Sequence, residues 1–133
     1  AQAEKSLPGR CIIASVRDEL GDVYRMMDAV CLMSDQEGFP LVMLEAMHCG
    51  RPFVGTPVGG VAEIIEDRVN GLITNGSAEH LADRLKLLAD NPRWAAGIAA
   101  EGAACVERFG YAHRMARDYE QLLHHLWNLR QAA

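Results

Sequence analysis

One stretch decides the fold: it reads AVCLMSDQEGFPLVMLEAM and spans residues 29–47. It opens with a short apolar run, Ala29–Met33, whose lack of alternation is typical of a strand covered on both faces. A polar loop follows, and then a helical segment, Leu41–Cys49, that is apolar on nearly all sides. Pro40 suits the start of this helix, where its missing N–H costs little. The stretch therefore predicts a buried parallel strand, a loop at its carboxyl end and a buried helix.

Similar short runs lie on both sides of this stretch and alternate with helical patterns, which indicates βαβ units and a parallel sheet. The other expected strands are Cys11–Ala14, Pro52–Gly55 and Gly71–Thr74. The other expected helices of this part lie near Gly21–Met27 and Val61–Glu66.

From Ser77 onward the pattern is purely helical, with Ser77 as a candidate cap and Asn91-Pro92 as a break. Three helices are expected, over Ala78–Asp90, Arg93–Arg108 and Ala112–Leu129. The fold class is therefore α/β: a Rossmann-like parallel sheet of three to four strands, in one domain over residues 1–133, with a helical tail over 78–133.

The composition limits the classes of partner. Half of the 133 residues are hydrophobic and the formal net charge is -5, which argues against coating of nucleic acid or of an anionic membrane. No apolar run approaches the roughly 18 residues of a membrane span. The chain lacks an initial Met and a signal peptide, so its opening suggests the middle of a longer protein. Four separated cysteines suggest buried free thiols and a cytoplasmic protein, which could lie at the cytosolic face of a membrane.

The helix that starts after Pro40 is a candidate phosphate site. It lies at the carboxyl edge of the sheet, where open α/β folds bind ligands. The N–H groups of Leu41, Val42 and Met43 are expected to be free at this helix start, and together with the helix dipole they suit a phosphate or diphosphate. Gly38 permits close approach of a ligand to the backbone.

Glu45 is unexpected within so apolar a helix, because a buried carboxylate is unfavourable unless it is paired or hydrogen-bonded. Sugar hydroxyls would satisfy it, but so would an Arg or a backbone N–H. Glu37 is weaker evidence, because a carboxylate before a helix is favourable for dipole reasons alone. The Gly59-Gly60 loop is either part of the same cleft edge or a tight turn before a helix.

Five ordered motifs between about Arg10 and Leu126 resemble those of a known family. Glu37 and Glu45 form an E-x7-E pair around Gly-Phe-Pro, and four further segments also match. The chain resembles the C-terminal, donor-binding domain of retaining GT-B glycosyltransferases of the glycosyltransferase family 4-like, "glycosyl transferases group 1" type. The four further segments are Asp22–Val30, Glu45–Val54, Thr56–Ile65 and Asn70–Ile73.

The resemblance implies transfer of a sugar from a nucleotide-diphosphate donor to an acceptor hydroxyl, with retained configuration. It gives Glu45 the ribose hydroxyls and gives Glu37 a catalytic place beside the transferred sugar. Arg17 would meet the base. The loop and helix start would hold the sugar and the diphosphate, mainly through backbone N–H groups, over Gly38, Phe39, Pro40, Leu41 and Val42. The family needs no metal and no cofactor besides the donor.

The match lacks the acceptor-binding N-terminal domain and the Arg/Lys pair that neutralises the diphosphate. We therefore expect the isolated fragment to be inactive, with the missing GT-B domain or another chain as partner. The alternative function is a non-catalytic nucleotide-sugar-binding or interaction module. A nucleotide-sugar epimerase is less favoured, because the Glu37–Glu45 pair points to transfer.

In the usual strand order 3-2-1-4-5-6, the strands that should separate the first expected strand from the others are absent. Ala29–Met33 would then be an exposed edge. We expect pairing with another chain, a rearranged Cys11–Ala14, or a partner that supplies the missing strands.

The remaining candidates have structural explanations. His48 beside Cys49 has no second pair at ligand spacing, so we expect no metal site. His124-His125 is expected on a solvated or interdomain helix face, and both tryptophans, Trp94 and Trp127, in packing. The last helix has an apolar stripe that could be left exposed. Its members are Tyr119, Leu122, Leu126 and Leu129.

Overall fold

The computed structural model describes residues 9–13, 20–109 and 112–131. Its centre is a parallel sheet of three strands in the order β1-β2-β3, which are β1 (Val30–Leu32), β2 (Phe53–Gly55) and β3 (Leu72–Ile73). Val30 is paired with Phe53, and Val54 with Leu72. The α/β class and the three strands from Ala29 onward are confirmed, in the order that the sequence predicts.

The helices also follow the predicted order. Ser77 caps α5 as expected, since its Oγ accepts the N–H of His80 at 3.1 Å. The described helices are α2 (Leu20–Met26), α3 (Leu41–His48), α4 (Gly60–Ile64), α5 (Ala78–Asp90), α6 (Pro92–Phe109) and α7 (Ala112–Gln131).

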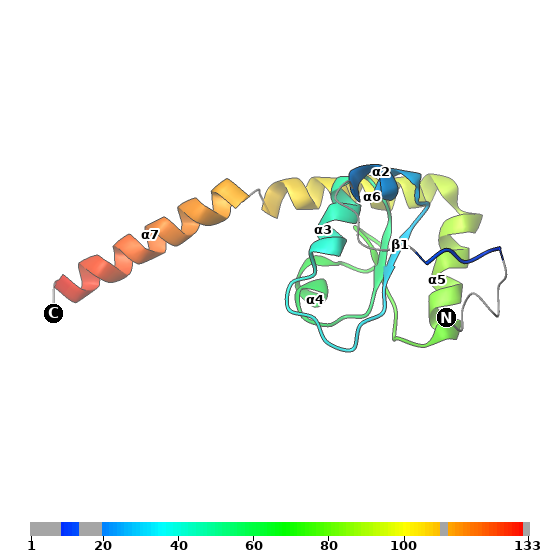
Figure 1. Ribbon diagram of the computed structural model, residues 1–133, viewed down its shortest axis with the longest axis horizontal. Coiled ribbons are helices and arrows are strands. Elements are labelled where there is room, and N and C mark those ends of the chain that lie inside the picture. Colours follow the sequence, from blue (N-terminus) through cyan, green and yellow to red (C-terminus); the bar gives the residue numbers. More distant parts are fainter. Residues whose placement is uncertain (1–8, 14–19, 110–111, 132–133) are drawn as a thin grey trace.

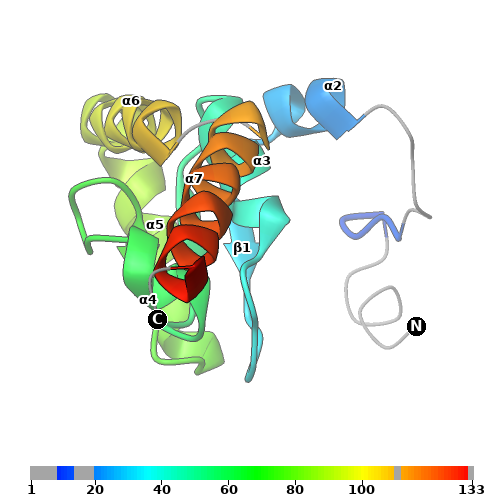
Figure 2. The same ribbon diagram turned by 90° about the vertical axis from the view of Figure 1, so that its left-hand side faces the viewer.

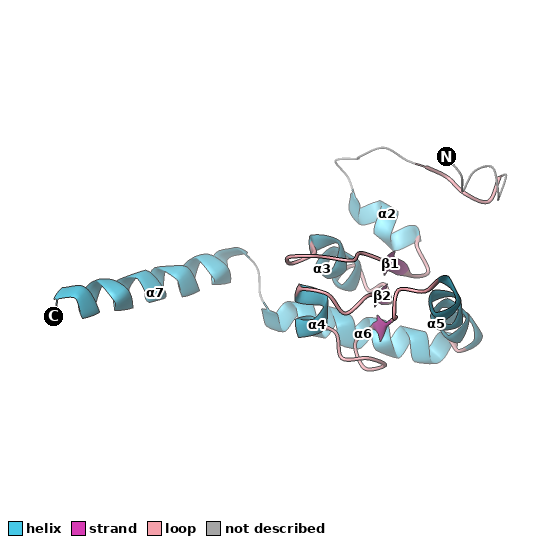
Figure 3. Cartoon of the chain, turned by 90° about the horizontal axis from the view of Figure 1, so that it is seen from below, coloured by secondary structure: helices cyan, strands magenta, loops and turns pink. Residues whose placement is uncertain are grey.

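Helices cover both faces of the sheet. Helices α3 and α4 lie on one side and α5 on the other (Figures 1 and 3). Helix α6 crosses one end of this sandwich and packs against both α3 and α5. From α3, Met43, Ala46 and Met47 are fully buried, and they join Phe53 of β2 in the core. This packing fixes α3 and the loop before it at the carboxyl edge of β1.

The prediction of a strand over Cys11–Ala14 is wrong for residues 11–13, which form no strand; Ala14 lies outside the described residues. Ile12 is 91% exposed and Ile13 is 58% exposed. Figure 2 shows residues 9–13 away from the sheet. The physical reason is the lack of a neighbour, because β1 pairs only with β2 in the part of the chain that the structure describes. The expectation that β1 is an exposed edge is confirmed there.

Helix α7 extends away from the rest of the described chain (Figure 1). Its predicted stripe is exposed, from 51% at Leu122 to 61% at Tyr119. Trp127 is 61% exposed, so its predicted packing role is wrong, whereas Trp94 packs as expected, against the core cluster that contains Leu88 and Ile98. No described helix is long and apolar enough to cross a membrane.

The four cysteines are free, as predicted, but their expected burial is wrong for three of them. Only Cys105, which packs between α6 and α3, is buried. Cys31 is exposed because it lies on the edge strand of the described sheet.

Two loops at the carboxyl edge of the sheet are held together by glycines. Gly60 N–H donates to the Gly38 carbonyl at 2.7 Å. Gly59 has a φ of +49° and a ψ of -136°, a conformation that only glycine adopts readily. A Cβ on Gly59 would lie 2.5 Å from the Gly38 carbonyl oxygen and still closer to that of Glu37. The loop before α4 therefore buttresses the loop before α3.

Gly59→Ala should destabilise the protein by about 2 kcal/mol or more, because it adds both backbone strain and a clash with two carbonyl groups. Gly97→Ala is the matched control: Gly97 lies within α6 with open space around its Cα, and alanine there should stabilise by about 0.5–1 kcal/mol. Urea unfolding of both variants measures the two effects. Equal effects of the two substitutions would contradict this account of the loop contact.

The isolated 133-residue chain should self-associate through the edge of β1 that has no neighbouring strand among the described residues, because such an edge offers backbone donors and acceptors for pairing. Sedimentation velocity over a range of concentrations should show association, and Cys31→Lys on β1 should weaken it. Ala82→Lys, at an exposed position of α5, should not. A monomer at every concentration, with a cooperative melt, would contradict the prediction.

Candidate functional site

The loop between β1 and α3 holds Glu37 at the edge of a shallow polar pocket. Ser34 Oγ donates to Glu37 Oε1 at 2.6 Å, and the Ser34 carbonyl accepts the Thr56 hydroxyl at 2.6 Å. Glu37 is therefore held by its own loop, which is in turn tied to the end of β2. The pocket is lined by residues of both loops, so the Gly59-Gly60 loop is part of the cleft edge as well as a tight turn. The lining residues are Asp35, Gln36, Glu37, Gly38, Val58 and Gly59.

The start of α3 faces outward from this edge. Pro40 occupies the N-cap position with an extended backbone, and no side chain caps the helix. Met43 N–H donates to the Pro40 carbonyl at 3.2 Å, so the expectation of a free N–H is wrong for Met43. Among the described residues, no such partner is found for the N–H groups of Leu41 and Val42. The N–H groups of Leu41 and Val42 at the start of α3 are therefore available to a ligand.

Helix α3 is not buried on all sides, contrary to the sequence-based expectation. Leu41 is 65% exposed and Val42 is 39% exposed, beside Phe39 at 48%. The apolar composition of α3 therefore serves two surfaces: a core face against the sheet and an open face next to the pocket. An open apolar face next to polar backbone groups is typical of a ligand site or an interface.

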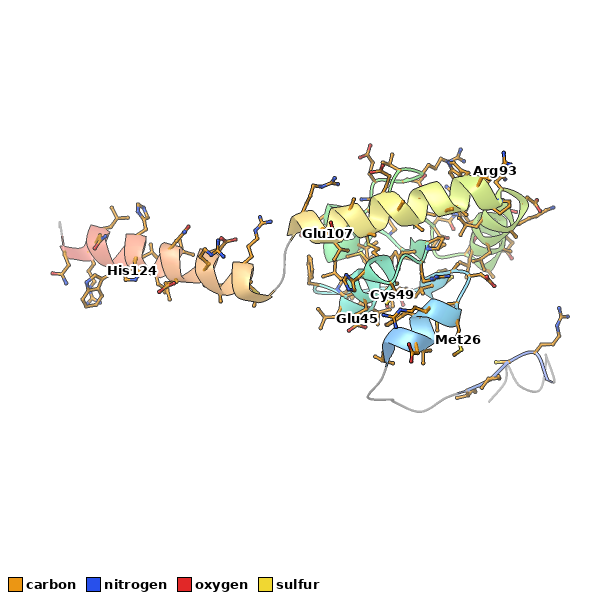
Figure 4. The ribbon with its side chains drawn as sticks, turned by 90° about the horizontal axis from the view of Figure 1, so that it is seen from above. Met26, Glu45, Cys49, Arg93, Glu107 and His124 are labelled. Carbon is orange, nitrogen blue, oxygen red and sulfur yellow. The ribbon has the colours of Figure 1, made fainter. Side chains whose placement is uncertain are left out.

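Glu45 lies half-buried on α3, at a part of the helix beside α2 (Figure 4). Its Oε2 accepts the hydroxyl of Tyr24 at 2.8 Å. Tyr24 comes from α2 and is only 7% exposed. The sequence suggested an Arg or a backbone N–H as the alternative partner of Glu45. That identity is wrong, because the partner is the Tyr24 phenol. No sequence pattern singled out Tyr24 as a site residue, although it lies within the segment Asp22–Val30 that carries the resemblance.

The contact perturbs the phenol. Burial, together with the hydrogen bond to Glu45 and its negative charge, raises the pKa of Tyr24 to about 12. The phenol therefore stays protonated at physiological pH and remains a donor to the carboxylate.

The remaining predicted candidates, and one further arginine, have the following places. Arg17 lies outside the described residues. Within the described ranges no three His, Cys, Asp or Glu side chains gather as metal ligands would, and His124 and His125 are exposed on α7 as expected. Arg51 has a structural role, because it donates to the carbonyls of Met27 and Cys49 at 3.1 and 3.3 Å.

The shifted pKa of Tyr24 predicts a pH effect. Between the ordinary pKa of 10.0 and the folded-state value of about 12, the folded chain keeps a proton that the unfolded chain releases. The free energy of unfolding should therefore fall as the pH rises through this window. In Tyr24→Phe this part of the fall, up to about 3 kcal/mol near the upper limit, should disappear.

Urea unfolding at several pH values between about 9 and 12 measures this difference. Tyr119→Phe, at an exposed tyrosine of α7, is the control and should keep the wild-type slope. Equal slopes for wild type and Tyr24→Phe would mean that Tyr24 ionises normally.

Curated relatives match this chain over part of their length. A D-inositol 3-phosphate glycosyltransferase of Xylanimonas cellulosilytica is 42% identical over 97 residues, which are 71% of this chain and 23% of that protein. An N-acetyl-alpha-D-glucosaminyl L-malate synthase of Bacillus anthracis is 37% identical over 83 residues, 61% of this chain and 22% of the relative. The chain thus spans less than a quarter of the length of either.

Solved structures give the same picture. HepE of Anabaena in complex with UDP-glucose superposes with a TM-score of 0.85 at 25% identity, over 92% of this chain and 35% of that one. The sucrose-phosphate synthase of Thermosynechococcus elongatus gives 0.82 at 28% identity, over 96% and 33%. These GT-B glycosyltransferases share the arrangement of sheet and helices described above.

The family described as "Glycosyl transferases group 1" matches residues 1–91, the part that contains β1, the Glu37 loop, α3 and the Gly59-Gly60 loop. This chain belongs to the glycosyl transferases group 1 family.

Proposed function

We propose that this chain is the donor-binding part of a retaining glycosyltransferase, which moves a sugar from a nucleotide-diphosphate sugar to an acceptor hydroxyl. One observation carries the proposal: the open start of α3 follows the carboxyl end of β1, and Glu37 in the loop before it and Glu45 in the helix itself are each held by a side-chain hydrogen bond. Ligands of open α/β folds bind at this edge.

The arrangement suits the three parts of a nucleotide sugar. Half-buried Glu45 can accept hydrogen bonds from ribose hydroxyls. The N–H groups of Leu41 and Val42 and the dipole of α3 suit the diphosphate. Glu37 borders the polar pocket, where it can accept from hydroxyls of the transferred sugar and stabilise positive charge that develops at the anomeric carbon. Gly38, Phe39 and Pro40 supply the backbone between these groups.

The ligands of related structures support the binding of a nucleotide sugar. HepE was solved in complex with UDP, and with UDP-glucose. By family resemblance we assign Arg17 to the base, retention of configuration to the transfer, and no metal or other cofactor to the site. We extend these properties to this chain as part of the proposal.

The chain alone should bind more readily than it turns over. A diphosphate between two carboxylates needs more positive charge than one helix start supplies. Arg51 is already engaged with backbone carbonyls. We therefore propose that residues 1–133 are a partial donor domain, with the helical tail 78–133 within it. In this proposal the full enzyme adds an acceptor-binding domain and an Arg/Lys pair. It works in the cytoplasm and binds no nucleic acid. A variant of the proposal puts it at the cytosolic face of a membrane.

A second candidate is a non-catalytic nucleotide-sugar-binding or interaction module. The exposed stripe of α7 and the open edge of β1 favour it, because both are surfaces that interactions use. An acceptor domain and an Arg/Lys pair encoded upstream in the same reading frame would favour the enzyme instead.

Calorimetric titration of the full-length protein with UDP, GDP, ADP and their sugars tests the donor site. One of these nucleotides should bind, and Glu45→Gln should weaken it by about tenfold or more, since a charged acceptor is replaced by an amide. Glu63→Gln, at an exposed carboxylate of α4, should change affinity little. If no nucleotide binds, the donor-site assignment is wrong.

A further inference from the structure

We propose that Tyr24 is a positioning residue for the donor: its phenol holds the Glu45 carboxylate in the one orientation that meets the ribose hydroxyls. This inference rests on the proposed function, and it assigns a role to a residue on a different helix from the E-x7-E pair. It starts from a single contact, the 2.8 Å hydrogen bond between Tyr24 Oη and Glu45 Oε2.

Tyr24 is itself fixed by the core. Its ring is 7% exposed and belongs to the cluster that includes Met43 and Met47 of α3. The end of α2 is tied down as well, since the Met27 carbonyl accepts from Arg51 at 3.1 Å. Tyrosine has only two side-chain torsions, so burial of the ring fixes its hydroxyl within a narrow range. The position of the phenol hydroxyl is therefore fixed, and it can restrict the more flexible Glu45 side chain.

The Glu45 side chain is flexible unless a neighbour restricts it. A glutamate on a helix has three rotatable torsions, and it loses that freedom when a ligand binds. Glu45 is only half-buried, so part of it is open to solvent. If one oxygen is already held by the protein, the remaining loss on binding is smaller and the affinity is higher.

The Glu45 carboxylate has enough acceptor sites for both the phenol and the ligand. A carboxylate offers about four lone-pair sites, of which the phenol occupies one. Two neighbouring ribose hydroxyls need two more. The phenol donates one hydrogen bond and carries no charge, so the carboxylate can still accept hydrogen bonds from ribose hydroxyls. An Arg at this place would instead form an ion pair with both carboxylate oxygens.

The competing explanation is that the contact only satisfies two polar groups at the edge of the core. The two explanations differ in one observable. A positioning role acts on the ribose hydroxyls, so it disappears when the ligand lacks them. A structural role weakens every nucleotide to the same extent.

The experiment is a cycle of binding measurements on the full-length protein. UDP, GDP and ADP are each compared with the corresponding 2′,3′-dideoxynucleoside diphosphate, on wild type, Tyr24→Phe and Glu45→Gln. Wild type should prefer the nucleotide with ribose hydroxyls. Tyr24→Phe should reduce this preference by about fivefold to twentyfold, with little change for the dideoxy nucleotide. Tyr119→Phe on the exposed α7 is the matched control and should retain the full preference.

Two results would overturn the positioning role alone. In one, Glu45→Gln loses the preference while Tyr24→Phe keeps it. In the other, Tyr24→Phe weakens both nucleotides equally. A wild type that binds nucleotides without any preference for ribose hydroxyls would overturn the role of Glu45, and with it that of Tyr24. A wild type that binds no nucleotide would overturn the proposed function itself.

A second variant keeps the test valid if Tyr24→Phe does not fold. Glu45→Asp keeps the charge but shortens the side chain by one methylene, so the carboxylate cannot meet the phenol and the ribose together. This variant should lose the preference for ribose hydroxyls to nearly the same extent as Glu45→Gln. Full preference in Glu45→Asp would show that charge alone is sufficient, and would overturn the positioning role.

Discussion

The packing of α3 between the sheet and α6 is the constraint on which the rest of the structure depends. Its buried face, formed by Met43, Ala46 and Met47, allows α3 only one position relative to β1 and β2. That position brings its open start to the carboxyl edge of the sheet and turns Glu45 toward α2. The same helix thus supplies much of the core and most of the candidate site. A change in its packing would displace Glu45 and the N–H groups of Leu41 and Val42 together.

Much of this arrangement could be predicted from the sequence because it is set by local signals. Apolar runs of strand length, Pro40 and the Ser77 cap give the elements from β1 onward to within about two residues. The need of Glu45 for a polar partner follows from the apolar residues around it. These are properties of short segments, which can be read one at a time.

The errors fall where distant parts of the chain decide the outcome. Residues 11–13 have the composition of a strand, but a strand needs a neighbour, and the described sheet offers them none. The exposure of Leu41 and Val42 depends on which other segments pack against α3, and the pattern of apolar residues along the helix does not contain that information. The partner of Glu45 is 21 positions away, and a tyrosine on a short helix gives no sign by itself of the carboxylate that it will meet.

Three open surfaces of the described residues bear on function: the edge of the sheet at β1, the stripe on α7 and the start of α3. The first two are suited to protein contacts. The third combines the N–H groups of Leu41 and Val42, which have no partner among the described residues, with two carboxylates held by Ser34 and Tyr24. The central claim is that this third surface holds a nucleotide sugar. The most direct measurement is a crystal structure of the full-length protein with the nucleoside diphosphate that it binds best. The account predicts ribose hydroxyls within about 3.2 Å of the Glu45 carboxylate and a diphosphate oxygen within that distance of the Leu41 or Val42 nitrogen. A nucleotide bound at another edge of the sheet, or bound with its ribose away from Glu45, would contradict it.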